Sequence, residues 1–269
     1  MKNTGSVLII VGLLLLGTAV YGLFRTMRNE AVFDEEKTLH NRLHDISIGY
    51  PEVNEQLKQK TGESNIDFAV RINKVVNDGM IHYWKDAGVE KYHLRVPVWE
   101  NYILFGASYL CPESYRKYEF SNWQKNLERG VGLCSTHSTV VKGVLRNNGI
   151  KAELMDVGGH HVVVRAELND TATWILDPDF GVVVPFDTAA ITANPELVRK
   201  PFEHMADLYY PDAIEPYTTD FMVEIFGHKK YIYTINNRFE TFSYYAIWVL
   251  PILLIGTGWM LRRSKKTVR

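Results

Sequence analysis

The chain has 269 residues, of which 46% are hydrophobic, and its formal net charge is −1. This length is enough for one good-sized domain with additional segments. Because the chain carries no excess of basic residues, nucleic acid is not an expected partner.

Two long apolar runs lie near the ends of the chain. Residues 7–24 and 243–261 contain no charged side chain, and each run is close to the roughly 20 residues that cross a bilayer as a helix. Pro251 fits such a helix, because membrane helices tolerate a kink. The first run could instead be a cleaved signal peptide, but only Lys2 precedes it and no clear cleavage site follows. We therefore predict an N-terminal membrane anchor within residues 1–24 and a second transmembrane helix at 243–261.

The charges beside these runs predict how the chain is oriented. The tail, residues 262–269, carries five cations and no acid, and basic residues next to a membrane span stay in the cytoplasm. Both termini are therefore expected to be cytoplasmic. Residues 25–242 would then lie outside the cell membrane, on the extracytoplasmic side.

The segment between the two runs has no repeat, no low-complexity tract and no Pro/Gly/Ser-rich linker, so we expect 25–242 to form one domain. Apolar residues recur at helical spacing from Asp67 to Trp84, which predicts an amphipathic helix. Residues Ser121 to Gln124 have the S-x-x-Q form of a capping box. They predict a short helix that ends near the turn at Gly130–Gly132.

A further helix and several strands are predicted in the second half. Val141, Val144 and Leu145 form the apolar stripe of a helix from Cys134 to Asn148, with Gly149 as its C-terminal cap. Four strands are predicted after it, at Ala152–Val157, His161–Leu168, Thr173–Leu176 and Val182–Pro185. This order indicates an α+β fold in which a helix packs on an antiparallel sheet.

The last part of the domain has weaker patterns. A helix is predicted to begin at Asn194–Pro195 and to include Leu197, Met205 and Leu208. One more strand is predicted at Lys229–Ile235, just before the second apolar run.

Three residues in this region suggest nucleophilic catalysis. Cys134 follows a glycine turn and opens a predicted helix, His161 opens a Val-rich strand, and Asp177 ends another strand. A thiol is a useful nucleophile when it is ionised, and a helix N-terminus with a nearby imidazole lowers a thiol pKa from about 8.5 towards neutrality. The order therefore predicts a nucleophile, a base and a residue that orients the base.

Each of these residues has an alternative. Cys134 could be a buried structural thiol or could form a disulfide with Cys111, since an extracytoplasmic compartment can be oxidising. A structural cysteine, however, has no need of a following helix start or of a downstream histidine and aspartate. Cys111, which precedes Pro112, is expected to be a small buried residue.

The histidine and the aspartate each have a close competitor. His160 and His161 are adjacent, and because neighbouring strand residues point to opposite faces, only one of them can easily approach the thiol. Spacing alone does not choose between them. Asp177 could be a turn residue before Pro178, and Asp179 is the natural replacement for it in the catalytic role.

A metal site is a further alternative. His137 lies three residues after Cys134 on the same helix face, so these two residues, one strand histidine and Asp177 could bind zinc tetrahedrally. Zinc spacing with a single cysteine is weakly specific, so no metal and no cofactor is expected. The other histidines, such as His82, His93, His204 and His228, are expected to be solvated or structural.

The chain also resembles the transglutaminase-like superfamily of papain-type folds. Typical members have a G-x-C segment that opens a helix, a "GI" turn that ends it, a strand that begins H-a-W-V-E and a strand that ends W-x-x-L-D-P. The corresponding segments here are Gly132–Cys134, Gly149–Ile150, His161–Arg165 and Trp174–Pro178, within a matching region of roughly 67–186. Val163 and Arg165 depart from the family pattern, which usually has an aromatic and an acidic residue there.

The resemblance implies a transglutaminase-like fold and a Cys134–His161–Asp177 triad, with His161 as the base and His160 as a core or second-shell residue. It implies acyl transfer or amide hydrolysis on a peptide or other amide-bearing substrate. It also implies an oxyanion site formed by the backbone N–H of Cys134 and a side chain from Gln124, Trp99 or Asn101.

Similar membrane-anchored bacterial proteins suggest a role in envelope polysaccharide assembly, with assembly proteins as partners. Two functions of other classes stay open. One is a catalytically silent transglutaminase-like scaffold or binding module of an envelope complex, and the other is a small zinc protein.

Overall fold

The computed structural model describes residues 2–34, 47–204, 218–235 and 238–263. The chain divides into two units. We call residues 1–27, 89–118 and 236–269 the helical unit, and residues 28–88 and 119–235 the sheet unit. The segment 89–118, which the sequence places within one domain at 25–242, groups with the terminal helices.

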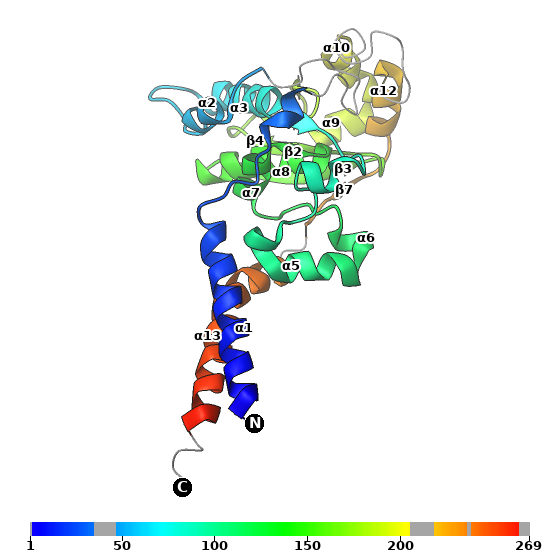
Figure 1. Ribbon diagram of the computed structural model, residues 1–269. Coiled ribbons are helices and arrows are strands. Elements are labelled where there is room, and N and C mark those ends of the chain that lie inside the picture. The colour runs from blue at the N-terminus through cyan, green and yellow to red at the C-terminus, as the bar shows by residue number, and fades with distance from the viewer. Residues whose placement is uncertain (1, 35–46, 205–217, 236–237, 264–269) are drawn as a thin grey trace. The chain divides into compact units, whose positions relative to one another are not determined.

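In the helical unit, the two apolar runs form α1 (Lys2–Gly22) and α13 (Arg238–Arg263), which lie side by side (Figure 1). Both helices are long and apolar enough to cross a membrane. Glycines let them approach closely: a Cβ on Gly5 would lie 2.7 Å from the carbonyl oxygen of Gly258, and one on Gly12 would lie 2.8 Å from that of Pro251. The numbering of these contacts shows that the helices are antiparallel.

The rest of the helical unit is α4 (Gly88–Lys91), α5 (Val98–Leu110) and α6 (Pro112–Tyr115). Polar bonds join α5 to α13. The amide of Asn101 donates to the Ser243 hydroxyl at 2.8 Å, and the Tyr102 hydroxyl donates to the carbonyl of Ile247 at 2.9 Å. The sequence reasoning did not predict α5, because its apolar residues do not form a single stripe.

The sheet unit contains a five-stranded antiparallel sheet in the order β6-β5-β4-β3-β7. The predicted strands are confirmed with small shifts in their ends. They are β3 (Lys151–Val157), β4 (His161–Glu167), β5 (Thr173–Asp177), β6 (Val182–Val184) and β7 (Lys230–Ile232). The mixed α+β class is thus as expected from the sequence.

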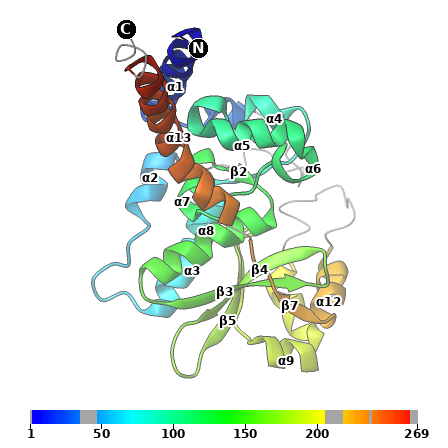
Figure 2. The ribbon, with the colours of Figure 1, turned by 90° about the horizontal axis from the view of Figure 1, so that it is seen from below.

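Helices α3 (Asn65–Gly79) and α8 (Cys134–Asn147) pack on one face of this sheet (Figure 2). Val144 of α8 and Phe68 of α3 belong to the same buried cluster as Val164 of β4, because alternate strand residues point to this face. The intervening residues, such as Val163, face a second buried cluster. That cluster includes residues of α9 (Thr188–Ala193), η2 (Pro195–Val198), α10 (Arg199–Phe202) and α12 (Thr219–Gly227).

The predicted helix at Asp67–Trp84 is too long. Helix α3 ends at Gly79, and the chain becomes extended at Met80. Two short strands then pair in parallel, β1 (Ile81–His82) with β2 (Val131–Gly132). Met80, Ile81 and Tyr83 are therefore buried in and beside this short strand rather than on a helix face.

Other predicted element ends also need correction. Helix α7 (Trp123–Arg129) is capped by Asn122, whose side chain accepts from the N–H of Gln124, and not by Ser121. The helix ends as predicted at Gly130, which has a φ of 70°. The helix predicted from Asn194–Pro195 is a 3₁₀ turn followed by α10, while Met205 and Leu208 lie outside the described residues. Two other short elements, η1 (Glu30–Asp34) and α2 (Tyr50–Glu55), complete the sheet unit.

Candidate active site

Cys134 is the first residue of α8, at the point where β2 turns into the helix. The turn is held by hydrogen bonds from its own residues. The N–H of Leu133 donates to Thr136 Oγ1 at 3.1 Å, and the hydroxyls of Ser135 and Thr136 donate to Glu119 Oε1 at 2.5 and 2.7 Å. The thiol is half-buried, so it is fixed in place but still reachable.

His161 is positioned by the hairpin between β3 and β4. Gly158 and Gly159 have φ values of 68° and 74°, a backbone conformation that glycine adopts without strain. Because they form the turn, the strand begins at His161, which is 1% exposed. His160 is exposed in the turn and contacts Phe221. The expectation that His160 is a core or second-shell residue is therefore wrong.

Asp177 is fully buried at the end of β5 and reaches His161 directly. Its Oδ2 lies 2.7 Å from His161 Nε2. Val164 pairs with Leu176 across the two strands, so Asp177 faces Val163 and is the diagonal neighbour of His161 on the same face of the sheet. The other carboxylate oxygen accepts the N–H groups of Asp179 and Phe180 at 3.1 and 3.3 Å.

Helix α3 holds the loop that follows Asp177. The side-chain amide of Asn73 donates to the carbonyls of Asp177 and Val182 at 3.3 and 3.0 Å. One turn later, the amide of Asn77 donates to the carbonyls of Pro178 and Asp179 at 3.1 and 2.8 Å. Sequence reasoning missed both asparagines. They could have been found because both amide side chains lie next to the apolar stripe of the predicted helix, where a polar group needs a hydrogen-bond partner.

The thiol, the imidazole and a second carboxylate meet at one place. One donor atom from each of Cys134, His161 and Asp179 lies within 4.8 Å of the other two. Burial opposes protonation of His161, but the charges of Asp177 and Cys134 and the hydrogen bonds with both residues raise its pKa well above the usual value. Since Nε2 faces Asp177, proton exchange with the thiol would have to use Nδ1.

Asp179 also belongs to a second buried His–Asp pair. Its two carboxylate oxygens lie 2.7 and 2.8 Å from His82 Nδ1. His82 is placed here because it pairs with Gly132 in the β1–β2 ladder, two residues before Cys134. The sequence reasoning named His82 only among scattered histidines and did not connect it with the site.

His137 lies beside this pair. Its Nδ1 is 2.8 Å from the carbonyl oxygen of Leu133, which can only accept, so Nδ1 carries the proton. The same nitrogen is 3.6 Å from Asp179 Oδ1. Burial lowers the pKa of His137, although the Asp179 charge and backbone carbonyls oppose this effect.

The donor atoms that could hold a metal differ from the predicted set. That set was Cys134, His137, a strand histidine and Asp177. In the structure His137 Nδ1 is bonded to a carbonyl, and the Asp177 oxygens are bonded to His161 and to two N–H groups. The trio with suitable spacing among the described residues is Cys134, His161 and Asp179.

The other cysteine, Cys111, belongs to the helical unit. Cys111 is a free thiol and is exposed, so the expectation of a small buried residue is wrong. It follows the last residue of α5, where the chain leaves the helix and its side chain is not packed. Cys134 is free as well, and the disulfide alternative is not formed.

The predicted side-chain oxyanion donors are not joined to the site by any contact that the structure describes. Gln124 is exposed on the first turn of α7. Asn101 is bonded to Ser243 in the helical unit, to which Trp99 also belongs. Tyr233, which the sequence reasoning did not consider, is closer to the chemistry: burial and the charges of Glu119 and Cys134 raise its pKa to about 12.

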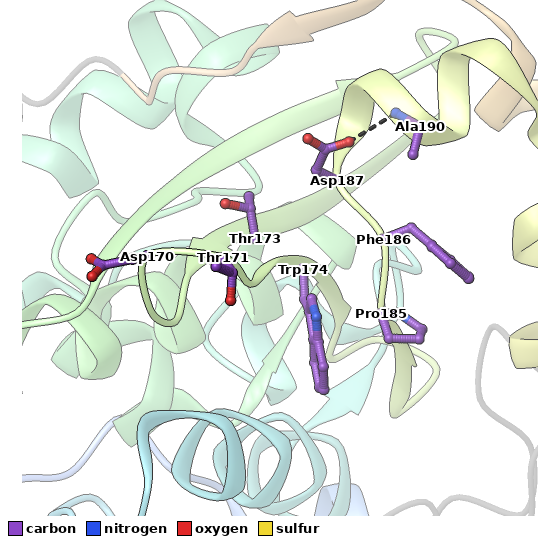
Figure 3. Close-up of a pocket in the computed structure, with 8 residues that line it drawn as sticks. All are labelled: Asp170, Thr171, Thr173, Trp174, Pro185, Phe186, Asp187 and Ala190. Atoms are coloured by element: carbon purple, nitrogen blue, oxygen red, sulfur yellow. Dashed lines mark hydrogen bonds between the residues drawn. The ribbon is translucent and has the colours of Figure 1, made fainter.

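A separate pocket of about 400 Å³ lies at the other end of β5 (Figure 3). It is lined by Trp174, by residues of the β4–β5 turn such as Asp170, and by the segment Pro185–Asp187. The Asp187 carboxylate caps α9 by accepting the N–H of Ala190 at 2.8 Å. The pocket contains none of the three predicted catalytic residues.

Comparisons with protein-family models, with curated proteins and with solved structures give no match to this chain. The chemistry of the site therefore rests on its own geometry.

Proposed function

We propose that the protein is a membrane-anchored, transglutaminase-like cysteine enzyme that performs acyl transfer or amide hydrolysis. The observation that carries the proposal is the buried His161–Asp177 bond of 2.7 Å beside a half-buried thiol at a helix N-terminus. A nucleophile, a base and a residue that orients the base are the parts that such catalysis requires.

The geometry supports a specific order of proton transfers. Cys134 Sγ gives its proton to His161 Nδ1 and attacks the carbonyl carbon of an amide. When the tetrahedral intermediate collapses, the C–N bond breaks and His161 protonates the leaving amine. Water or a second amine then resolves the thioester. Asp177 accepts the hydrogen bond from His161 Nε2 and so holds the imidazole with its proton on that nitrogen.

The negative oxygen of the intermediate needs preorganised donors. The backbone N–H of Cys134 at the start of α8 is one. We propose the hydroxyl of Tyr233 as the second, in place of Gln124, Trp99 or Asn101. Tyr233 and Cys134 pack against the same buried cluster, and burial raises the pKa of the Tyr233 hydroxyl to about 12, so that it stays protonated.

The two terminal helices support a membrane location. Their apolar composition and length fit two spans, and the five cations of the tail favour cytoplasmic termini. We propose that the site lies outside the cell membrane and acts on an amide-bearing component of the envelope or of polysaccharide assembly. An impermeant protease added to intact cells should cleave between the helices, and complete protection would overturn the orientation.

Thiol labelling tests the catalytic proposal. In the full-length protein, iodoacetamide at pH 7 should modify Cys134 at least tenfold faster than Cys111, because only Cys134 has an imidazole partner. Asp177→Asn should remove most of this difference. Equal, slow labelling of both thiols would instead favour a catalytically silent module.

A further inference from the structure

The site has a second kind of chemistry that the proposed function does not use. Cys134, His161 and Asp179 come from a helix start, a strand start and the loop after β5, yet one donor atom from each lies within 4.8 Å of the others. Thiolate, imidazole and carboxylate are the three ligand types that zinc takes in proteins, at bond lengths of about 2.0–2.3 Å.

Two of these three residues already have the supporting bonds that zinc ligands need. A histidine ligand almost always donates its other ring N–H to a carboxylate or carbonyl, and a carboxylate ligand is itself hydrogen-bonded. His161 Nε2 lies 2.7 Å from Asp177 Oδ2, so a metal would bind His161 through Nδ1. Asp179 is held by His82 Nδ1 at 2.7 and 2.8 Å.

The geometry needs little change to accept an ion. Ligand atoms on a tetrahedral zinc are about 3.3–3.7 Å apart, given the bond lengths above. The observed limit of 4.8 Å therefore requires the atoms to close by at most about 1.5 Å. Three protein ligands leave a fourth position for water, because Cys134 is only half-buried.

We propose that Cys134, His161 and Asp179 form a binding site for Zn²⁺ that reversibly blocks the thiol. Binding converts the thiol to a zinc-bound thiolate and releases its proton to the buffer. No electron is transferred. His161 Nδ1 then holds the metal and can no longer accept a proton from Cys134. Zinc and acyl transfer therefore exclude each other at this site.

Cobalt(II) reports such binding directly, because a thiolate on tetrahedral Co²⁺ gives an intense charge-transfer absorption. The experiment uses the full-length protein in detergent with Cys111→Ser, so that Cys134 is the single thiol. One equivalent of Co²⁺ should produce the absorption, and Zn²⁺ should bleach it. Cys134→Ser in the same background should remove it completely.

The roles of Asp179 as a ligand and of His82 as its hydrogen-bond partner are tested in the same Cys111→Ser protein. His82→Asn should weaken Co²⁺ binding by about 10–100-fold, the usual effect of losing the support of a ligand. Asp179→Asn removes a ligand and should weaken binding at least as much. Asp170→Asn, an exposed aspartate in the β4–β5 turn, is the matched control and should leave affinity unchanged. Melting temperatures measured without metal separate a lost ligand from a misfolded protein.

Iodoacetamide labelling completes the test. Zn²⁺ should protect Cys134 from alkylation, and EDTA should restore the labelling. Absence of a thiolate–cobalt absorption, or unchanged affinity in a folded Asp179→Asn protein, would overturn the proposal. These readouts do not require turnover, so a protein that binds Co²⁺ but shows no selective alkylation would refute the proposed enzyme and leave the zinc site standing.

Discussion

The helical unit and the sheet unit place their apolar side chains in opposite ways. In the sheet unit, large apolar residues fill two clusters on the two faces of the sheet. In the helical unit, the large apolar residues of α1 and α13 are mostly exposed; Leu14, for example, is 67% exposed and Leu253 is 60% exposed. The contact between these helices is made by glycines, and polar bonds join α13 to α5.

This difference is the one expected between a unit that folds in water and helices that cross a membrane. In water, burial of apolar surface is the main driving force for packing, as the sheet unit shows. In lipid that force between helices is absent, and close approach through small residues together with interhelical hydrogen bonds takes its place. The helical unit has these features. Its buried acids are bonded too, Glu100 to the Tyr244 hydroxyl at 2.6 Å and Glu240 to the Tyr118 hydroxyl at 3.1 Å.

The largest expected effect lies in the sheet unit alone. His161→Ala should abolish selective alkylation of Cys134 and lower any turnover by several orders of magnitude, because residues that act as a unit lose activity together. His160→Ala is the matched control. Since His160 is exposed, its loss should change stability by about 0.5 kcal/mol or less. A reactive thiol in His161→Ala would reject the triad.

The next prediction tests the hydrogen bonds from α3 that hold the loop after β5. Asn77→Leu removes the donor of two buried carbonyls, those of Pro178 and Asp179. Unsatisfied buried groups cost about 1–3 kcal/mol each, so unfolding should be easier by about 2–4 kcal/mol. Lys74→Leu, on an exposed side chain of the same helix, should be nearly neutral. Denaturant unfolding measures both, and equal stability would show that the loop has other support.

Substitution of a glycine at the contact between α1 and α13 should have a smaller effect on stability. Gly12→Leu places a side chain where Pro251 and Ile255 already lie, and overpacking of this kind costs about 1–3 kcal/mol. Gly17→Leu, with no atom within 4 Å of its Cβ position, is the control. Cross-linking between cysteines introduced into α1 and α13, measured in detergent, should fall only in the first variant. An equal fall in cross-linking in both variants would contradict the proposal that close approach at Gly12 holds the two helices together.

The smallest expected effect is electrostatic and concerns the ion pair between Glu63 and Arg71 in the sheet unit. The hydrogen bond from Arg71 is the main reason that the pKa of Glu63 falls to about 2. An acid with a depressed pKa stabilises the fold above its unfolded value of about 4.3 and loses this contribution as the pH falls towards 2. Glu63→Gln should therefore flatten the fall in stability between about pH 4.5 and 2, by no more than about 1–2 kcal/mol. Melting curves across that range would show an unchanged slope if the pair were unimportant.

Local patterns predicted the elements that carry the chemistry. The glycine before Cys134, the Val-rich strand after His161 and the apolar strand that ends at Asp177 are short-range signals, and the structure brings those three residues together. Their catalytic roles stay predictions. The two apolar helices were visible for the same reason, since an unbroken uncharged run needs no tertiary information.

Contacts between residues that are far apart in the sequence could not be predicted from it. The pairing of β1 with β2 brings His82 next to Gly132 and so to the site, but two-residue strands leave no periodic signal. The change at Met80 from helix to strand depends on that same pairing. The bonds of Asn77 join positions about a hundred residues apart, which a pattern of neighbouring residues cannot reveal.

The close contact of Gly5 with Gly258 has a consequence for the order in which the protein is made. Helix α1 ends at Gly22 and α13 begins at Arg238, so the contact between them can form only after the chain between them has been made. Contacts between such distant positions form late, because the intervening chain must be brought together first. In the sheet unit, by contrast, all five described strands of the sheet exist once residue 232 is made. A chain that stops just before Arg238 would therefore contain the whole five-stranded sheet but lack the helix that packs along α1.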